Sequence, residues 1–238
     1  NVYAELFDND GVTELAGSYT TTTATFNKNG LAAGTYFIRI RTFYLSEFAP
    51  YDLTVNLIAA PLANDAELND SVEIALPLPV NTSVTGHIGY FYNDYDDLND
   101  YYALTLPVDG KLTVTIDPLL GQYTYATLLD NNGTTVLFNG YSNSVLSQTA
   151  NNLAAGTYYI RIRNYYAYEF TPYTLTTSLE PMNFPAEDAA NNDIPTTATL
   201  LPANTAKSGH LNFYYNLDED NIDWWVIGYD GSGPMTIT

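Results

Sequence analysis

An internal repeat of about 122 residues constrains the fold of this chain more than any other feature. The segment Leu31–Arg41 reads LAAGTYFIRIR, and Leu153–Arg163 reads LAAGTYYIRIR. Ten of these eleven positions are identical, at an offset of 122 residues. Such a recurrence indicates duplicated structural units, and about 122 residues is an ordinary size for one β-sandwich domain.

A second repeated block fixes the phase of the repeat. It is offset by 123 residues and matches Gly86-His87 to Gly209-His210, and Asp97 and Asp100 to Asp220 and Asp223. The combined alignment predicts one complete β-sandwich repeat over residues 58–180. Residues 1–57 then correspond to the C-terminal half of a repeat, and residues 181–238 to the N-terminal half of the next one.

The two half-repeats raise a physical problem, because half of a sandwich exposes one face of its core and unpaired strand edges. Two solutions are open at this stage. The sequence is an excerpt of a longer tandem array, or the tail of one copy completes the head of the next by strand complementation, which would build a filament. The expected partners in both cases are neighbouring copies or repeats of the same unit.

The composition and patterning predict an all-β fold. The chain contains 22 Tyr, and Tyr and Thr favour strands while Asn, Asp and Gly favour turns. Strict alternation in 111–116 predicts a strand with Leu112, Val114 and Ile116 inward, and in 158–163 one with Tyr158, Ile160 and Ile162 inward. Hairpins are expected at 108–110, 130–133 and 154–156. We therefore expect tandem antiparallel β-sandwich domains of jelly-roll kind.

The charge balance excludes several classes of partner. Seven Lys and Arg against 27 Asp and Glu give a net charge of −20. Nucleic acids and anionic membrane surfaces would repel such a chain. No apolar run approaches the roughly 20 residues that cross a bilayer, so membrane insertion is not expected. The absence of cysteine excludes disulfides and thiolate metal sites.

The order of motifs resembles a known bacterial family. An acidic opening segment is followed by Gly-His-Ile (86–88), Asp-Tyr-Tyr-x-Leu (100–104), Asp-Gly-x-Leu (109–112) and Gly-Thr-Tyr-Tyr-Ile-Arg (156–161). This order is similar to that of the bacterial pre-peptidase C-terminal domain. The resemblance implies a jelly-roll-like sandwich, secretion to the outside of the cell or its surface, an accessory or adhesive role, and in some members calcium binding. Uninterrupted repetition departs from the family's usual single copy beside a catalytic domain, and favours a stalk, adhesin or fibre.

Two acidic regions are candidates for binding Ca²⁺. Loops dense in Asp and Asn can supply the six to eight oxygen ligands that this cation takes, and calcium-binding members of the family use acidic positions in these regions. The candidate ligands are Asp65, Asp70, Asp97 and Asp100, with Asp188, Asp193, Asp220 and Asp223 as the matching set in the next repeat. The alternative is that these carboxylates are solvated and only keep the protein soluble.

No catalytic constellation is expected. The two histidines, His87 and His210, occupy equivalent positions and lack a recognisable nucleophile motif, so each is expected to be structural. Paired carboxylates for glycoside hydrolysis would need a cleft, which nothing in the sequence indicates. Runs of aromatic residues place rings on both faces of their strands: Tyr90-Phe91-Tyr92, Tyr101-Tyr102, Tyr165-Tyr166 with Tyr168, and Trp224-Trp225. The outward rings either stack on sugars or a neighbouring subunit, or form cross-strand ladders.

These observations leave two functional hypotheses. The leading one is a structural or adhesive extracellular module of a bacterial surface stalk, adhesin or filament, with sandwiches joined end to end and clamped by Ca²⁺. The alternative is an accessory module of a secreted hydrolase that holds polysaccharide or protein substrate through exposed tyrosines. Neither hypothesis assigns an enzymatic step to the chain.

Overall fold

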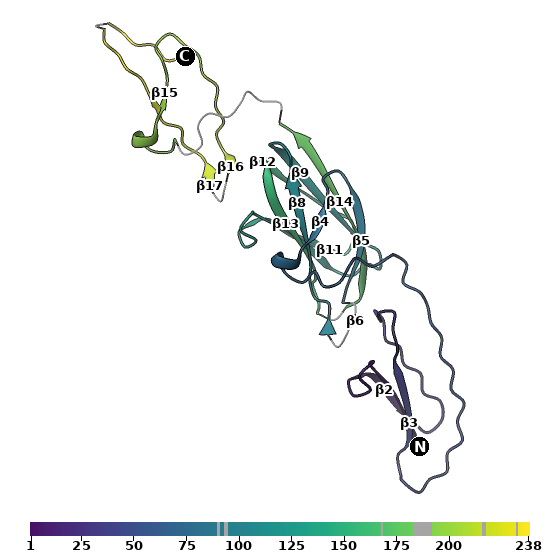
Figure 1. Cartoon of the computed structure of the whole chain (residues 1–238). Coiled ribbons are helices and arrows are strands. Elements are labelled where there is room, and N and C mark those ends of the chain that lie inside the picture. Colours follow the sequence, from purple (N-terminus) through teal and green to yellow (C-terminus); the bar gives the residue numbers. More distant parts are fainter. Residues whose placement is uncertain (90, 93–94, 168, 183–191, 216–217, 232) are drawn as a thin grey trace.

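The chain is an all-β protein, as predicted, in a computed structural model that describes residues 1–238 except 90, 93–94, 168, 183–191, 216–217 and 232. The helical segments in the described residues are two single 3₁₀ turns, η1 (Val72–Ile74) and η2 (Pro195–Thr197). Neither turn is long or apolar enough to cross a membrane. Figure 1 shows three parts in chain order: a small sheet, a sandwich and a second small region.

The middle part is a two-layer β-sandwich. One layer has the strand order β11-β10-β13-β8-β4, and the other contains β12-β9-β14-β5. The first layer comprises β4 (Leu76–Leu78), β8 (Asp100–Leu106), β10 (Thr124–Leu129), β11 (Val136–Ser142) and β13 (Gly156–Asn164). The second comprises β5 (Ser83–Ile88), β9 (Gly110–Pro118), β12 (Leu146–Leu153) and β14 (Thr171–Pro181). A short hairpin of β6 (Phe91–Tyr92) and β7 (Tyr95–Asp96) lies outside both layers.

The core lies between the two layers and is built from alternating strand positions. The six residues predicted to face inward are all buried: Leu112, Val114, Ile116, Tyr158, Ile160 and Ile162. They pack with residues such as Leu104 and Leu175 in one continuous cluster. Most strand pairs are antiparallel, but β4 runs parallel to β8 at the edge of its layer.

Two of the three predicted hairpins are wrong. Residues 130–133 connect the paired strands β10 and β11, and Gly133 takes the left-handed conformation that a tight turn needs. Residues 108–110 and 154–156 instead carry the chain from one layer to the other, since β8 and β9, and likewise β12 and β13, belong to different sheets. A short turn of small and polar residues serves both purposes, so local sequence does not distinguish a hairpin from a sandwich corner.

The N-terminal sheet repeats three strands of the sandwich in the same register. Its strands are β1 (Val2–Phe7), β2 (Glu14–Thr20) and β3 (Phe37–Thr42), in the order β2-β1-β3. Each pairing matches a pairing of β11-β10-β13 at an offset of 122; for example, Val2 lies opposite Thr20 as Thr124 lies opposite Ser142. The register shift also recurs, after Leu6 and after Leu128.

The C-terminal region repeats a different piece of the sandwich. Its parallel pair, β15 (Thr199–Leu200) and β18 (Trp225–Val226), matches β4 and β8 at an offset of 123, since Thr199 lies opposite Trp225 as Leu76 lies opposite Tyr102. A hairpin of β16 (Phe213–Tyr215) and β17 (Asp218–Asp220) extends the edge of the second layer. It does so through a parallel pairing of β16 with β12.

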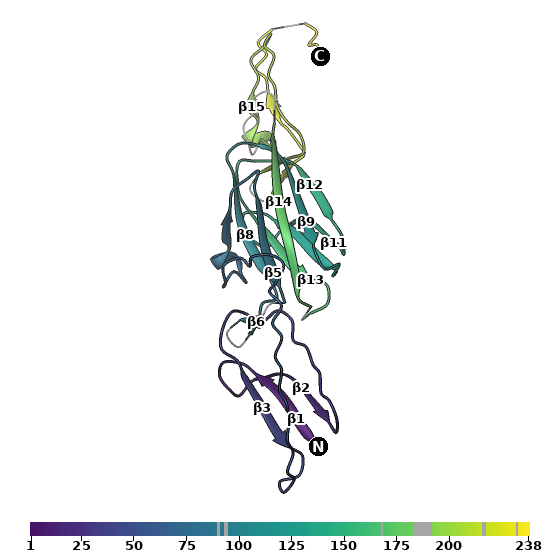
Figure 2. The ribbon, with the colours of Figure 1, turned by 90° about the vertical axis from the view of Figure 1, so that its right-hand side faces the viewer.

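The same inter-unit contact occurs at both junctions. At the second junction, the Asn152 side-chain amide donates to the carbonyl oxygen of Asn212 at 3.2 Å. The equivalent residues at the first junction are Gly30 and Gly89, where a Cβ built on Gly30 would lie 2.8 Å from the Gly89 carbonyl oxygen. All four residues have positive φ angles between 56° and 69°. Figure 2 shows the resulting arrangement, with the N-terminal sheet and the C-terminal region beyond opposite ends of the sandwich.

Candidate metal centre

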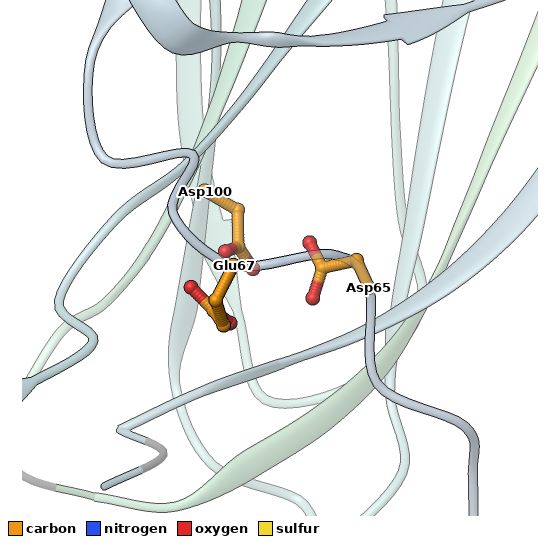
Figure 3. A group of neighbouring side chains, drawn as sticks. All are labelled: Asp65, Glu67 and Asp100. Carbon is orange, nitrogen blue, oxygen red and sulfur yellow. The ribbon is translucent and has the colours of Figure 1, made fainter. Parts of the chain in front are cut away.

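A cluster of carboxylates lies at one end of the sandwich core. Asp65 and Glu67 come from the segment that precedes η1, and Asp100 is the first residue of β8. One carboxylate oxygen from each of the three lies within 4.8 Å of the others. Figure 3 shows the three groups turned toward one another.

Backbone hydrogen bonds bring the two acidic segments together. The amide of Tyr101 donates to the carbonyl oxygen of Asn69 at 2.8 Å, which ties the opening segment to β8. The amide of Gly89 donates to the carbonyl oxygen of Asp97 at 2.8 Å, which holds the segment before β8 against the end of β5. Two stretches some thirty residues apart in sequence therefore converge on one site.

A pair of buried tyrosines forms the inner wall of this site. The Tyr102 hydroxyl donates to Oδ2 of Asp65 at 2.6 Å and lies 2.7 Å from the Tyr173 hydroxyl. The Tyr173 hydroxyl in turn donates to Oδ2 of Asp100. A second donor to Asp65 is the side-chain amide of Asn69, at 2.7 Å. These donors fix one oxygen of each aspartate and leave the other free to act as a ligand.

Asp97 has no such donors. Its side chain is fully buried, and the backbone of Asn99 is the donor that approaches it. Neither oxygen has a hydrogen bond of good geometry in the part of the chain that the structure describes. Within the described residues, three further buried oxygens of the cluster share this lack: Oδ1 of Asp65, Oε2 of Glu67 and Oδ1 of Asp100. Burying charged oxygens without partners is costly, so the site demands either protons or a cation.

The electrostatics point the same way. Burial, followed by the charges of Glu67 and Asp65, raises the pKa of Asp97 to about 9. Burial and the neighbouring Asp65 raise the pKa of Glu67 to about 7. Burial also raises the pKa of Asp65 and of Asp100, against hydrogen bonds from Tyr102 and Tyr173 respectively. A cation would reverse these shifts by stabilising the ionised carboxylates.

The donor set suits a hard divalent cation. All the candidate ligands are carboxylate oxygens, which is the chemistry of Ca²⁺ sites, whereas Zn²⁺ sites favour nitrogen and sulfur. In this group, three oxygens have no hydrogen-bond partner among the described residues: Oδ1 of Asp65, Oε2 of Glu67 and Oδ1 of Asp100. Ca²⁺ takes six to eight oxygens, so Asp97, water or backbone oxygens would complete its shell. The residues present fit Ca²⁺, and calcium binding stays a prediction.

The predicted ligands of the complete repeat fall into two groups. Asp65 and Asp100 belong to the group that could hold a metal, and Asp97 lies outside that group but close enough for its charge to act on Asp100. Asp70 is half-buried and approaches the backbone of Asn99, and its charge acts on Asp97 and Glu67. Glu67 was not among the predicted metal ligands, although it lies two residues from Asp65 in the same acidic opening segment.

The matching set in the next repeat is not gathered in the same way. Asp188 lies outside the described residues, Asp193 is exposed, and Asp220 and Asp223 are half-buried. In the described part of the chain, Asp65, Glu67 and Asp100 form the group of three or more that could hold a metal. The sequence contributes to this difference, because Ala190 and Trp225 stand where the complete repeat has Glu67 and Tyr102.

His87 lies beside the carboxylate cluster but packs against a ring. It is buried, and its imidazole meets the Phe170 ring edge-on with centroids 5.1 Å apart. Burial lowers the pKa of His87 in spite of the nearby Asp65. This environment is that of a packed core residue, as the sequence predicts.

A second feature, exposed and aromatic, lies on the outer face of the first layer. We call it the tyrosine patch, and it comprises Tyr123, Tyr125, Tyr141, Tyr165 and Tyr166. The rings of Tyr125 and Tyr165 stack at 5.5 Å, and the Arg163 guanidinium lies 3.9 Å above Tyr125. The N-terminal sheet carries an equivalent patch of Tyr3, Tyr19, Phe43 and Tyr44, with Arg41 above Tyr3.

The other predicted aromatic runs have mixed outcomes. Tyr102 is a core residue, Tyr101 is half-buried, and Trp224 is exposed. Tyr90 and Tyr168 lie outside the described residues, as do the side chains of Phe91 and Tyr92. The patch at Tyr165-Tyr166 is therefore the best candidate for the outward-facing rings.

Comparisons with known proteins return only distant structural likenesses. No protein-family model matches the chain, and a search of curated proteins gives no match either. Among solved structures, the chain is similar to a pre-peptidase C-terminal domain of a collagenase from Bacillus anthracis, with 17% identity and a TM-score of 0.36. That likeness covers 44% of this chain and 94% of the other.

Two further solved structures have similarly low sequence identity and TM-score. One is PliG from Aeromonas hydrophila, a periplasmic inhibitor of g-type lysozyme, with 16% identity, a TM-score of 0.33 and coverage of 44% of this chain and 97% of the other. The other is the K3 adhesin domain of Lys-gingipain from Porphyromonas gingivalis, with 18% identity, a TM-score of 0.27 and coverage of 41% and 72%. The fold assignment rests on the strand pairing described above.

Proposed function

We propose that this chain is a structural and adhesive extracellular module of a bacterial surface stalk, adhesin or filament. In this proposal β-sandwich units are joined end to end, and the chain works by spacing and transmitting tension rather than by catalysis. The sequence resemblance to pre-peptidase C-terminal domains supports the extracellular setting. The partners are neighbouring copies or repeats of the same unit.

The observation that carries the proposal is the recurrence of the junction. Gly30 approaches Gly89 at one junction, and Asn152 bonds Asn212 at the other, with the same left-handed backbone at all four positions. A flexible string of independent domains has no reason to repeat an inter-unit contact at equivalent residues. A stiff array requires it, because each unit must be set at the same angle to the next.

Calcium is the second part of the proposal. The cluster of Asp65, Glu67, Asp97 and Asp100 closes the end of the sandwich that carries Gly89, a residue of the first junction. A cation there would tie the opening segment, β5 and β8 together and stiffen the unit next to its junction. At a free calcium concentration of 100 times Kd, binding would raise the free energy of unfolding of the unit by about 2.7 kcal/mol.

The experiment compares the purified chain with calcium and with EGTA. We expect sedimentation and electron microscopy to give elongated particles that associate end to end, and a thermal melt of the sandwich that rises by several degrees with calcium. An equal melting temperature in both conditions, with no metal found by elemental analysis, removes the calcium part. Compact particles that stay monomeric at every concentration remove the end-to-end part.

The tyrosine patch supports a second candidate function, an accessory module that holds polysaccharide or protein substrate for a secreted hydrolase. Exposed tyrosines give large, rigid contact areas with a polar edge, and aromatic side chains are common anchors at binding surfaces. The patch recurs on the N-terminal sheet, which would give an array several weak sites and a gain from multivalency.

Retention on insoluble polysaccharides tests this candidate. The double variant Tyr141→Ala with Tyr165→Ala removes two exposed rings of the patch without touching the core. We expect retention of the intact chain, if it occurs, to fall at least tenfold in this variant, about 1.4 kcal/mol. The matched control is Val145→Ala, which removes an exposed apolar side chain outside the patch. Equal retention of the double variant and the control contradicts the binding role of the patch.

A further inference from the structure

The outer edge of β3 has no paired strand among the described residues, whereas the equivalent edge of β13 in the sandwich pairs with β8. In the sandwich, β13 pairs on one side with β10 and on the other with β8. In the N-terminal sheet, β3 pairs with β1, and its other side has no strand among the described residues. Free strand edges of this kind are templates for pairing with another chain.

The C-terminal region carries the strand that this edge lacks. Its β15–β18 pair reproduces the β4–β8 pair in the same parallel register. In the sandwich, the free side of β8 is occupied by β13, whereas β18 has β15 on one side and no strand on the other in the described part of the chain. The free edge of β3, which we call the acceptor edge, is equivalent to the edge of β13 that pairs with β8. The free edge of β18, which we call the donor edge, is equivalent to the edge of β8 that pairs with β13.

The residues that would meet in this pairing are apolar and exposed. Ile38 is 38% exposed, whereas its equivalent Ile160 is 0% exposed. In the tail, Ile227 and Tyr229 are exposed, whereas their equivalents, Leu104 and Leu106, are buried. Both surfaces thus expose the equivalents of core residues of a sandwich, and each carries the sequence equivalent to strands that the other lacks.

We propose that β18 of a second copy of this chain pairs with the free edge of β3, in the register of β8 on β13, and completes a sandwich across the joint. The template sets Phe37 opposite Val226, and Thr35 opposite Gly228, as Tyr159 lies opposite Ala103 and Thr157 opposite Thr105. This inference deepens the proposed function and rests on it, since it specifies how the end-to-end partners are joined.

The opposite layer of the joint follows from the same template. In the sandwich, β9 lies between β12 and β14, with Leu112 opposite Leu179. The equivalents of β12 and β14, residues 24–31 and 49–59, form no extended strand, and no strand lies between them in residues 1–57 as β9 does in the sandwich. Residues 233–238 of the second copy correspond to β9 and would supply that central strand.

Exposed apolar residues match across this second pairing as well. The template sets Leu57 opposite Met235, and Val55 opposite Ile237. Leu57 is 90% exposed and Ile237 is 91% exposed, whereas their equivalents Leu179 and Val114 are 8% and 1% exposed. Burying apolar side chains is favourable, so the joint would remove exposed apolar surface from both partners.

A hollow beside β3 marks where the corner of the second copy would sit. It is lined by Asp8, Asn9 and residues 32–36. At the equivalent place in the sandwich, the amide of Ala155 donates to Oδ1 of Asp109 at 2.7 Å, and Asp109 belongs to the corner between β8 and β9. The hollow therefore lies where the corner between β8 and β9 lies in the sandwich; the tail residue equivalent to Asp109 is Ser232, which is outside the described residues.

The chain's own tail lies beyond the opposite end of the sandwich from this edge, and the proposed occupant is the tail of a second copy. Figures 1 and 2 place the N-terminal sheet and the C-terminal region beyond opposite ends of the intervening sandwich. The donor and acceptor surfaces also differ from each other, so the contact is head-to-tail and propagates instead of closing into a two-fold dimer. The joint then contains the equivalents of the complete repeat except residues 116–122, which include the last part of β9.

Disulfide trapping tests the register. The chain has no cysteine, so single-cysteine variants report one contact each. The matched pairs are Phe37→Cys with Val226→Cys, and Thr35→Cys with Gly228→Cys. The mismatched pairs exchange the partners, which moves the two Cα atoms beyond the roughly 7 Å that a disulfide spans. In the template, the Thr105 and Thr157 hydroxyl oxygens lie 3.2 Å apart, so the equivalent side chains are within reach.

The two variants of each pair are unfolded in urea, refolded together and oxidised mildly, with one partner ¹⁵N-labelled so that mass spectrometry identifies the linked peptides. We expect matched pairs to give at least ~10 times more mixed disulfide than mismatched pairs. These side chains lie on the outer face, away from the joint's core, and the melt of the central sandwich serves as a folding control.

Each outcome is decisive. Matched and mismatched pairs that link equally, in particles that still associate end to end, overturn this register and leave the proposed function standing. Single variants that link mainly to themselves indicate a two-fold contact and overturn the head-to-tail joint. A chain that sediments as a monomer at every concentration overturns both the joint and the end-to-end assembly on which it rests.

Discussion

Asp97 is the residue whose preferred protonation state depends most on whether a cation is bound at the acidic cluster. Its carboxylate is fully buried and has no hydrogen-bond donor of good geometry in the described residues. Without a cation the ionised form is disfavoured, which is why burial and the neighbouring carboxylates raise its pKa to about 9. With a cation the same oxygens become ligands. The effect of substituting Asp97 on the stability of the sandwich should therefore have opposite signs without and with calcium.

We expect Asp97→Asn to stabilise the sandwich in EGTA and to weaken it in calcium. In EGTA the amide keeps the shape of the carboxylate and removes a buried acid, which should raise the free energy of unfolding by roughly 1–3 kcal/mol. In calcium the variant lacks an anionic ligand, so the calcium-dependent rise in melting temperature should shrink. Thermal melts in both conditions measure the two effects.

Asp117→Asn is the matched control, because Asp117 lies on the outer, half-buried face of β9. It should leave both melting temperatures nearly unchanged. A loss of stability by Asp97→Asn in EGTA as well as in calcium would contradict the account of a buried, unpartnered acid and indicate a plain packing role.

At the scale of the strand, the N-terminal sheet depends on an ion-pair network that the sandwich does not have. Glu5 of β1 accepts hydrogen bonds from Arg39 at 2.8 Å and from Arg41 at 3.1 Å, both on β3. These hydrogen bonds lower the pKa of Glu5 to about 2. In the sandwich the equivalent of Glu5 is Thr127, whose hydroxyl donates to Oδ1 of Asn139 at 2.7 Å instead.

This network predicts a pH dependence of the N-terminal sheet. The folded pKa of Glu5 is depressed below its usual value of 4.5, so its contribution is present above pH 4.5 and is lost as the pH falls toward 2. Glu5→Gln should therefore weaken the sheet at pH 6 but hardly at pH 2. Because both arginines are about half exposed, the effect should stay below about 1 kcal/mol. Hydrogen exchange of β1 amides measures it, and an equal loss at both pH values would contradict the ionic cause.

The strands and the core could be predicted from the sequence, because alternation over 111–116 and 158–163 depends on a period that burial itself imposes. The layer to which each strand belongs could not. The corners at 108–110 and 154–156 have the same small and polar residues as a hairpin, and only the packing of two sheets decides between them. The pairing of β1 with β3 was not predicted, but it follows the repeat, because it matches the pairing of β10 with β13 at the offset of 122 residues.

The acidic site was predictable in part for a similar reason. The density of aspartates indicated the two segments, but not which oxygens would be left without donors. Tyr102 and Tyr173 decide that, and they lie 71 positions apart on different layers. Glu67 was left out of the predicted ligands because the repeat was the guide to them, and the next repeat has Ala190 at the equivalent position.

On the scale of the whole molecule, the property at stake is whether the units are held at a fixed angle. Gly30 sits at the first junction with a φ of +67°, and a Cβ there would lie 2.7 Å from the Phe170 ring and 2.8 Å from the Gly89 carbonyl oxygen. Both the backbone conformation and the close approach favour glycine at this position. Gly30→Ala should therefore loosen the junction while leaving each unit folded.

Electron–electron distance measurements can detect that loosening, because the absence of cysteine allows two spin labels to be placed freely. With labels at Thr22→Cys and Thr134→Cys, both exposed, we expect a narrow distance distribution in the parent chain and a clearly broader one in Gly30→Ala, with an unchanged melt of the sandwich. Gly34→Ala is the matched control, since the nearest atom to its Cβ is 4.0 Å away. A distribution that is equally broad in the parent chain would mean that the units are linked without a set angle. The module could then space a distal partner but could not act as a stiff stalk.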